Sequence, residues 1–132
     1  MRYFLLVAAA AGLLGWVHPA RAEACLELLD KPTDAAACIE RSTKDAEAEL
    51  AKRLDELKAQ IAKQPVKSTR RQMTSDLRQA GDHWSAFVAA ECRLEAKAAS
   101  GRDDAPYAGS LCRRRLVDAR TQEVVELTKK LR

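Results

Sequence analysis

The stretch from Trp84 to Arg120 constrains the fold more than any other part of the chain. Trp84 and Cys92 are eight residues apart, so they lie close to one face of a helix. After a polar loop rich in Gly and Asp, Cys112 and Arg120 repeat this spacing on a segment that also has a helical pattern. A disulfide between Cys92 and Cys112 would join the two helices across their loop.

The segment before this stretch, from residue 34 to residue 63, is also strongly helical in pattern. Its apolar positions recur at steps of three and four and so form one stripe: Ile39, Thr43, Ala46, Leu50, Leu54, Leu57 and Ile61. The stripe could belong to a coiled coil, but a seam of about three to four heptads is too short to require one. We interpret it as one long helix of a bundle. A short helix over residues 23–31 is expected before it, ending at Pro32.

Two more helices are predicted, over residues 69–99 and from residue 105 to the C-terminus. The apolar face of the first holds Met73, Leu77, Ala80, Trp84, Phe87 and Val88. The buried candidates of the second are Leu111, Leu116, Val117, Val124, Leu127 and Leu131. The expected helix caps are Thr33 or Asp34, then Ser68 or Thr69, then Asp104. No strand pattern appears. The expected fold is therefore all-α: a small three-helix bundle or helical hairpin array with a short N-terminal helix, stapled by two disulfides.

The first 22 residues have the features of a signal peptide that is cleaved after Ala22. A basic start precedes an apolar run over residues 5–17, and a small-x-small motif ends the segment. A retained membrane anchor is the alternative, but a run of about 13 residues is shorter than the roughly 20 that a spanning helix needs. Lipidation at Cys25 is disfavoured because Glu23 interrupts the motif that it requires. The remaining residues, 23–132, form one domain.

All four cysteines lie in residues 23–132, and an even number in a small exported domain indicates two disulfides. Four cysteines allow three pairings. We predict the local pairing, Cys25–Cys38 and Cys92–Cys112, which closes loops of roughly 13 and 20 residues. Each such loop is worth about 3 kcal/mol in the chain-entropy model. A zinc site is the alternative, but the cysteine spacings do not suit it, and His83 is the only histidine after residue 22.

Charge and motif content argue against nucleic-acid binding and catalysis. Without the two leader arginines, 21 basic residues face 19 acidic ones, a formal charge of +2. Nucleic-acid binding needs a concentrated basic surface, which a balanced chain does not provide. No phosphate-binding glycine motif is present, and His83 alone supports no catalytic triad. We expect a protein that is not an enzyme and that has no metal or cofactor.

In the stretch from Trp84 to Arg120 the chain resembles the LprI-like lysozyme-inhibitor family of small exported helical proteins. That family has a Trp eight residues before a Cys, then a loop and a second Cys, followed by Leu and Arg at four and eight positions. Leu116 and Arg120 take the last two places here. Cys25 and Cys38 with residues 45–50 resemble the family's first half, so the likeness covers nearly all of residues 23–132. The chain departs from the family at four positions: Val88 stands in place of Arg, Gly81 of Gln, Ala51 of Asn and Leu54 of Tyr.

The resemblance implies a periplasmic or secreted helical domain that binds a protein partner, with lysozyme as the expected partner. Because animal lysozyme is basic, a formal charge of +2 gives no electrostatic steering towards it. The alternative function is a periplasmic helical chaperone or envelope adaptor that binds partners along an amphipathic groove and has no effect on lysozyme. No stable membrane anchor is expected after cleavage, and the oligomeric state does not follow from the sequence.

The loop over residues 100–110 is the predicted partner contact. Its ends would be held by the second disulfide, which lowers the entropy that it loses on binding. Tyr107 offers a rigid aromatic anchor, and Asp103 and Asp104 offer adjacent negative charges. The alternative is an ordinary helix connection in which Asp104 serves as a cap.

Trp84, Leu116 and Arg120 are interpreted as architectural residues. Trp84 shares the apolar stripe with Leu77 and is expected to be largely buried. The aliphatic part of Arg120 is expected to pack, with its guanidinium bound to a carboxylate such as that of Glu91.

Overall fold

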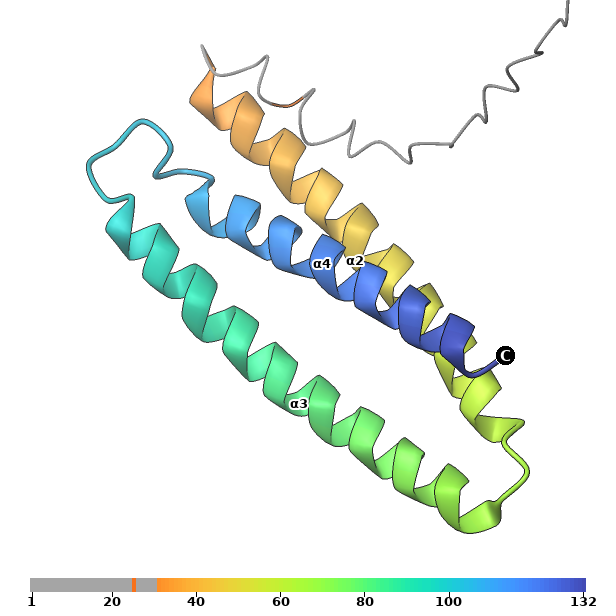
Figure 1. The fold of residues 1–132 in the computed structure, drawn as a ribbon. Helices are drawn as coiled ribbons and strands as arrows, with labels where there is room; N and C mark the ends of the chain where they lie inside the picture. Colours follow the sequence, from red (N-terminus) through yellow and green to blue (C-terminus); the bar gives the residue numbers. More distant parts are fainter. Residues whose placement is uncertain (1–24, 26–30) are drawn as a thin grey trace, which may run out of the picture.

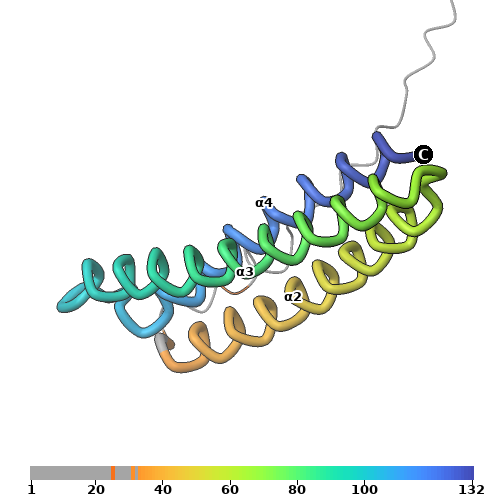
Figure 2. The backbone as a smooth tube through the Cα atoms, turned by 90° about the horizontal axis from the view of Figure 1, so that it is seen from below, coloured from red at the N-terminus to blue at the C-terminus, as the bar shows by residue number. Residues whose placement is uncertain are grey.

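A computed structural model describes Cys25 and residues 31–132, which contain three long helices. They are α2 (Pro32–Ala62), α3 (Lys67–Ala98) and α4 (Ala108–Lys130). The helices run side by side in an elongated bundle, and a second view shows the same arrangement (Figures 1 and 2). No strand occurs in this part of the chain. The predicted all-α three-helix fold is confirmed. The expected leader, and most of the expected short helix over residues 23–31, lie outside the described residues.

The predicted helix caps are wrong at the first two helices, because both helices begin earlier than expected. Lys31 is the N-cap of α2, and Val66 is the N-cap of α3, each without a capping side chain. The first residue of α2 is Pro32. Proline suits the first turn of a helix because its φ angle is already helical and its missing N–H is not needed there. At α3, the Nη1 of Arg70 donates to the Gln64 carbonyl at 2.6 Å and fixes the turn between the helices.

The main core lies between α2 and α4, with part of α3 against its side. Its buried members come from the predicted stripe of α2 and from two valines of α4: Ala46, Leu50, Leu57, Ile61, Val117 and Val124. Leu57 and Val117 are at most 1% exposed. At the far end of the bundle, the side-chain amide of Gln64 donates to the Leu131 carbonyl at 3.1 Å. The helical period of the sequence therefore locates this core correctly.

Three consecutive arginines of α4 bind the other two helices. Arg113 forms an ion pair with Glu47 of α2, and Arg115 forms one with Glu95 of α3. Successive residues point about 100° apart around a helix, so neighbouring arginines can reach different partners. These cross-helix bonds were not predicted from the sequence.

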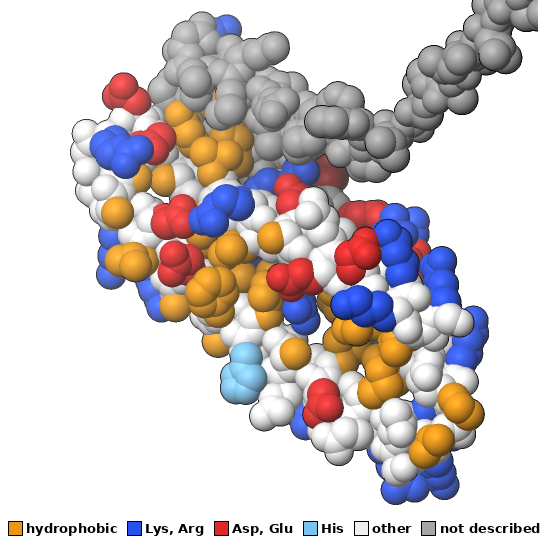
Figure 3. Space-filling view, viewed as in Figure 1, with side chains coloured by type: hydrophobic (Ala, Val, Ile, Leu, Met, Phe, Trp, Pro, Cys, Tyr) orange, Lys and Arg blue, Asp and Glu red, His pale blue; other side chains and the backbone are white. Residues whose placement is uncertain are grey.

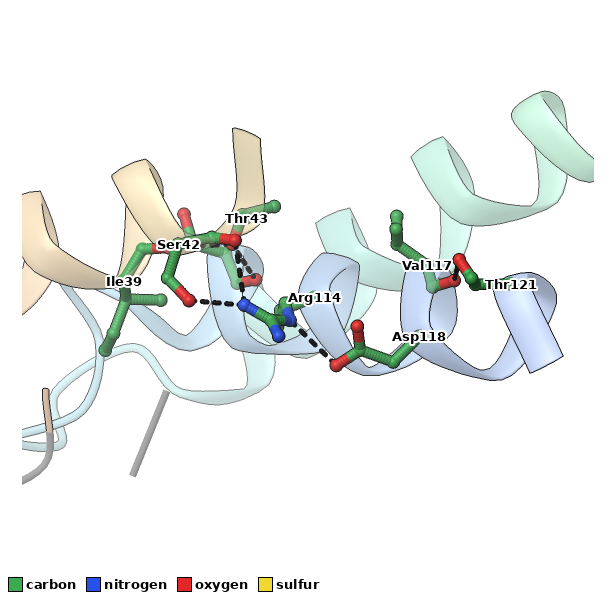
Figure 4. Close-up of polar contacts among 8 residues, drawn as sticks. Ile39, Ser42, Thr43, Arg114, Val117, Asp118 and Thr121 are labelled. Carbon is green, nitrogen blue, oxygen red and sulfur yellow. Dashed lines mark hydrogen bonds and ion pairs between the residues drawn. The ribbon is translucent and has the colours of Figure 1, made fainter. Parts of the chain in front are cut away.

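Arg114 is the best-sheltered of the three, with a side chain only 14% exposed. Its Nη1 donates to the Ser42 carbonyl of α2 at 2.8 Å and also to the Ser42 hydroxyl (Figure 4). Its Nε donates to the Asp118 carboxylate at 2.7 Å. Since Ser42 is buried, this arginine satisfies polar groups that water cannot readily reach.

Both predicted disulfides are present. The Cα atoms of Cys25 and Cys38 are 5.6 Å apart, and those of Cys92 and Cys112 are 5.3 Å apart. The second bond joins the last part of α3 to the first turns of α4 and is buried beside Val88. It therefore holds the two helices together next to their connecting loop.

Three residues predicted to lie on buried faces are exposed instead: Ala80 is one, and the other two are large side chains. Phe87 is 52% exposed and Leu127 is 44% exposed. Each is one residue away from a buried position, Val88 in α3 and Thr128 in α4, and is therefore rotated by about 100° from the core. The apolar pattern predicted a wider buried face than these helices have.

Candidate functional site

Trp84, Leu116 and Arg120 gather where the three helices meet. Trp84 packs against both the main core and the cluster around the second disulfide, and Leu116 packs against that same cluster. Arg120 and Trp84 line one groove. Trp84 is only partly buried, so the prediction that it is largely buried is corrected. Its side chain both packs against the core and lines this groove.

The groove opens between α2 and α3 and has a volume of about 390 Å³. A hollow with hydrophobic side chains is visible between α3 and the other two helices (Figure 3). The lining residues come from all three helices: Leu50, Leu54, Lys58, Thr74, Leu77, Arg78, Gly81, Asp82, Trp84, Ser85 and Arg120. The floor is therefore leucine and tryptophan, and the rim is polar and charged.

The cations of the rim have partners on their own helices. Arg120 Nη1 lies 3.1 Å from a Glu123 oxygen, so its carboxylate partner is Glu123 and not Glu91 as predicted. Lys58 Nζ lies 2.9 Å from an Asp55 oxygen, while Arg78 and Asp82 are 3.8 Å apart. Glu123 lies three positions after Arg120 on α4, and side chains at that spacing are neighbours on a helix, whereas Glu91 belongs to α3. This explains why Glu123 is the partner of Arg120.

Gly81 lies in the middle of α3 and forms part of the groove wall. A Cβ atom built on it would meet no heavy atom within 4 Å, and its φ angle is not positive. Neither close packing nor backbone conformation therefore requires glycine here. Glycine inside a helix costs about 1 kcal/mol relative to alanine.

The loop over residues 99–107 differs from the predicted partner contact at two residues. Tyr107 is buried, at 7% exposure, in a cluster with Cys25, Ala35 and Ile39, so it cannot serve as an exposed aromatic anchor. A bulky aromatic ring next to the first disulfide gains more from burial than from solvent exposure.

Asp104 is not the predicted side-chain cap. The third helix begins at Ala108 with Tyr107 as its N-cap, three residues later than expected. The Asp104 carboxylate instead pairs with Arg102 at 2.6 Å. Its backbone carbonyl accepts hydrogen bonds from the amides of Tyr107 and Ala108. Asp103 is exposed and stays a predicted contact.

An exposed apolar stripe lies on the C-terminal half of α3 and was not predicted. Phe87 is 52% exposed and Leu94 is 62% exposed. They are seven residues apart with Ala90 between them, so they lie on one face about 10 Å apart along the helix axis. The spacing of 87, 90 and 94 was the available signal, but of these three residues only Phe87 was predicted to lie on the buried face, and the other two were not considered.

Two ion pairs at the surface each shift the pKa of one partner. Hydrogen bonds from Arg53 to Glu56 and Glu49 raise the pKa of that guanidinium. A hydrogen bond from Lys129 lowers the pKa of Glu126. Neither group lines the groove. No group of three or more His, Cys, Asp or Glu side chains in these residues is placed to hold a metal ion.

The family model described as "Lysozyme inhibitor LprI" matches residues 25–124. The chain belongs to the LprI family. The matched span contains both disulfides, the groove and the exposed stripe of α3. The family description names an inhibitor rather than a catalyst. No curated protein and no solved structure gives a match.

Membership of LprI and the two disulfides indicate a protein that works outside the cytoplasm. None of the helices in residues 31–132 combines the length and hydrophobicity that crossing a bilayer requires. Trp84 and Arg120 of the resemblance line one groove, and Leu116 packs against the disulfide cluster that Trp84 also contacts, which is why that groove is the candidate site.

Proposed function

We propose that the chain is an exported protein inhibitor of lysozyme. The observation that carries this proposal is the LprI match over residues 25–124. Two disulfides support it, because a protein that meets lysozyme does so in an oxidising compartment. Both bonds lie at the end of the bundle that carries the α3–α4 loop, so a binding surface near that loop would need little ordering on contact.

The exposed stripe of α3 together with Asp103 is the surface that we propose contacts lysozyme. Phe87 and Leu94 are large exposed apolar side chains on the C-terminal half of α3. Aromatic and aliphatic groups of this kind anchor protein interfaces when a partner pocket covers them. Phe87 thus takes the role that the sequence assigned to Tyr107.

Short-range packing, rather than charge, would dominate the affinity. The formal charge of residues 23–132 is +2, so long-range attraction to a basic lysozyme is absent. Inhibition should therefore change little between 50 and 300 mM salt, whereas an electrostatically steered inhibitor would weaken over such a range.

The direct test is inhibition of cell-wall clearing by a panel of lysozymes of different structural types. The purified disulfide-bonded protein should slow clearing by at least one type. A chaperone or adaptor would instead leave every lysozyme active and suppress the aggregation of an unrelated unfolding protein. That second pattern would refute the proposal.

The contact surface is tested with a double variant, Phe87→Ser with Leu94→Ser. Both side chains are exposed, so the fold should survive while inhibition falls at least tenfold, a hot-spot effect of about 1.4 kcal/mol or more. The matched control is Val66→Ser with Leu127→Ser, which removes exposed apolar groups of other surfaces. Equal loss of inhibition in both double variants would exclude the stripe. Asp103→Ala should have a smaller effect in the same assay.

Export is proposed to proceed by cleavage after Ala22. The Cys25–Cys38 bond supports this over lipid attachment, because a lipidated Cys25 sulfur could not also form that disulfide. The intact mass of the exported protein should correspond to a chain that begins at Glu23. A mass that includes a lipid on Cys25 would refute this route.

A further inference from the structure

The groove between α2 and α3 has the composition of a small-ligand site. Its floor is formed by Leu50, Leu54, Leu77 and Trp84, and its rim by charged and hydroxyl side chains. Its volume of about 390 Å³ lies within the range of roughly 300–1,000 Å³ in which small-molecule sites occur. An apolar floor with a few polar groups at its edge is the arrangement that holds a ligand with one polar end.

Gly81 is a second feature that suits a ligand, because a glycine leaves the wall of the groove open. Glycine lowers helix stability, and no neighbouring atom would obstruct a side chain at this position. A side chain here would project next to Trp84 and Leu77 in the groove wall. The fold would therefore gain from a larger residue, whereas a ligand in the groove would lose space.

The charge of the rim defines the polar end of the ligand. The described lining residues include three cations, Lys58, Arg78 and Arg120, and one carboxylate, Asp82. Lys58 and Arg78 are more than 60% exposed, and their ion pairs on the helix surface are of the weak, solvent-screened kind. They can therefore turn to a bound anion at little cost.

We propose that this groove binds a single-chain amphiphile with an anionic carboxylate head, such as a medium-chain fatty acid. The alkyl chain lies on the leucine and tryptophan floor beside Gly81, and the carboxylate meets the cations of the rim. This binding is separate from lysozyme inhibition and does not depend on it. The proposed lysozyme contact, Phe87 and Leu94, does not line the groove.

The binding test uses dodecanoate, below its micelle concentration, with the disulfide-bonded protein. Trp84 is the only tryptophan among the described residues and lines the groove, so its fluorescence reports occupancy. Saturable binding with a blue shift is expected, confirmed by calorimetry. Dodecyltrimethylammonium should bind at least tenfold more weakly. Equal affinity for the cationic amphiphile, or no saturable binding of dodecanoate, would overturn the proposal.

Gly81→Leu separates a ligand site from an incidental surface hollow. The variant should melt at a higher temperature than the parent, because leucine favours helix, yet bind dodecanoate at least tenfold more weakly. Ala80→Leu is the matched control: it adds a similar volume at an exposed position next door that does not line the groove, and affinity should be unchanged. Unaltered affinity in a folded Gly81→Leu variant would overturn the proposal.

The role of the cations is tested with Lys58→Gln and Arg78→Gln together. Affinity for dodecanoate should fall at least fivefold, while affinity for uncharged dodecanol should stay the same. Lys52→Gln with Arg71→Gln removes two exposed cations outside the groove and should leave both affinities unchanged. An equal loss of dodecanoate affinity in the two double variants would show that only net charge matters and would refute a localised head-group site.

Discussion

The contact between α2 and α4 differs sharply from the attachment of α3. The first buries a continuous row of aliphatic side chains and is crossed by hydrogen bonds and ion pairs from Arg113, Arg114 and Gln64. In α3, by contrast, the buried residues are Val88 and Cys92. The bundle is therefore a well-packed helix pair with a third helix fastened to its side.

The fastening of α3 is uneven along its length. Its C-terminal part is tied to α4 by the Cys92–Cys112 bond and by the ion pair between Glu95 and Arg115. Its N-terminal half contributes only partly buried side chains, Met73 and Leu77, to the core. The groove and the exposed stripe both involve this helix. Stability thus resides mainly in the α2–α4 pair, while α3 supplies the surfaces available for binding.

The largest expected difference is between two leucines. Leu57 of α2 is fully buried, so Leu57→Ala should lower the free energy of unfolding by about 4 kcal/mol through lost burial and a cavity. Leu77 of α3 is partly exposed at the groove, and Leu77→Ala should cost about 1 kcal/mol. Chemical denaturation of both variants measures the two values. Similar losses would contradict the division between the α2–α4 pair and α3.

Removal of the second disulfide should have the next largest effect and should act mainly on α3. Cys92→Ala with Cys112→Ala removes the bond between two residues that are 20 positions apart in sequence. The free energy of unfolding should fall by about 3 kcal/mol. Hydrogen exchange should accelerate more in α3 than in α2 and α4, because α3 has few other buried contacts. Uniform acceleration in all three helices would instead indicate that the bundle opens as one unit.

Arg114 tests the polar part of the α2–α4 contact. Arg114→Met keeps the aliphatic bulk but leaves the Ser42 carbonyl and hydroxyl without this donor, and should cost about 2 kcal/mol. Arg113→Met is the matched control, since the side chain of Arg113 is 51% exposed and its pair with Glu47 lies at the surface. Thermal unfolding should distinguish the two. Equal stability of both variants would mean that the arginine bonds to Ser42 add nothing.

The sequence predicted the helical fold and the cysteine pairing because both depend on local spacing. The stripe from Ile39 to Ile61 has the period of a helix, and local disulfides need only neighbouring elements. The burial of Phe87 and Leu127 was predicted wrongly for the same reason. Periodicity shows which residues share a side of a helix, but not how wide a contact the neighbouring helix offers.

The candidate site was predictable only in part. Trp84, Leu116 and Arg120 were singled out by their spacing, and Trp84 and Arg120 line one groove, but the groove needs the separation of α2 from α3, which no local pattern contains. Tyr107 was misplaced because its burial depends on Cys25 and Ile39, which are distant in sequence. Hydrophobic character alone did not distinguish an exposed anchor from a buried one.

The smallest effect is expected at Glu126, on the outer surface of α4. Its carboxylate accepts a hydrogen bond from Lys129 at 2.7 Å, which holds its pKa below the ordinary value of 4.5. A carboxyl group whose pKa is lower in the folded state adds stability above its unfolded pKa and loses it as the pH falls through the folded pKa. Glu126→Gln should therefore lower the melting temperature slightly at pH 7 and leave it unchanged near pH 2. Because both side chains are about 60% exposed, the shift at pH 7 should be far smaller than that of Arg114→Met. A loss at pH 7 as large as that of Arg114→Met would show that surface charge, and not the buried contact with α2, holds α4 in place.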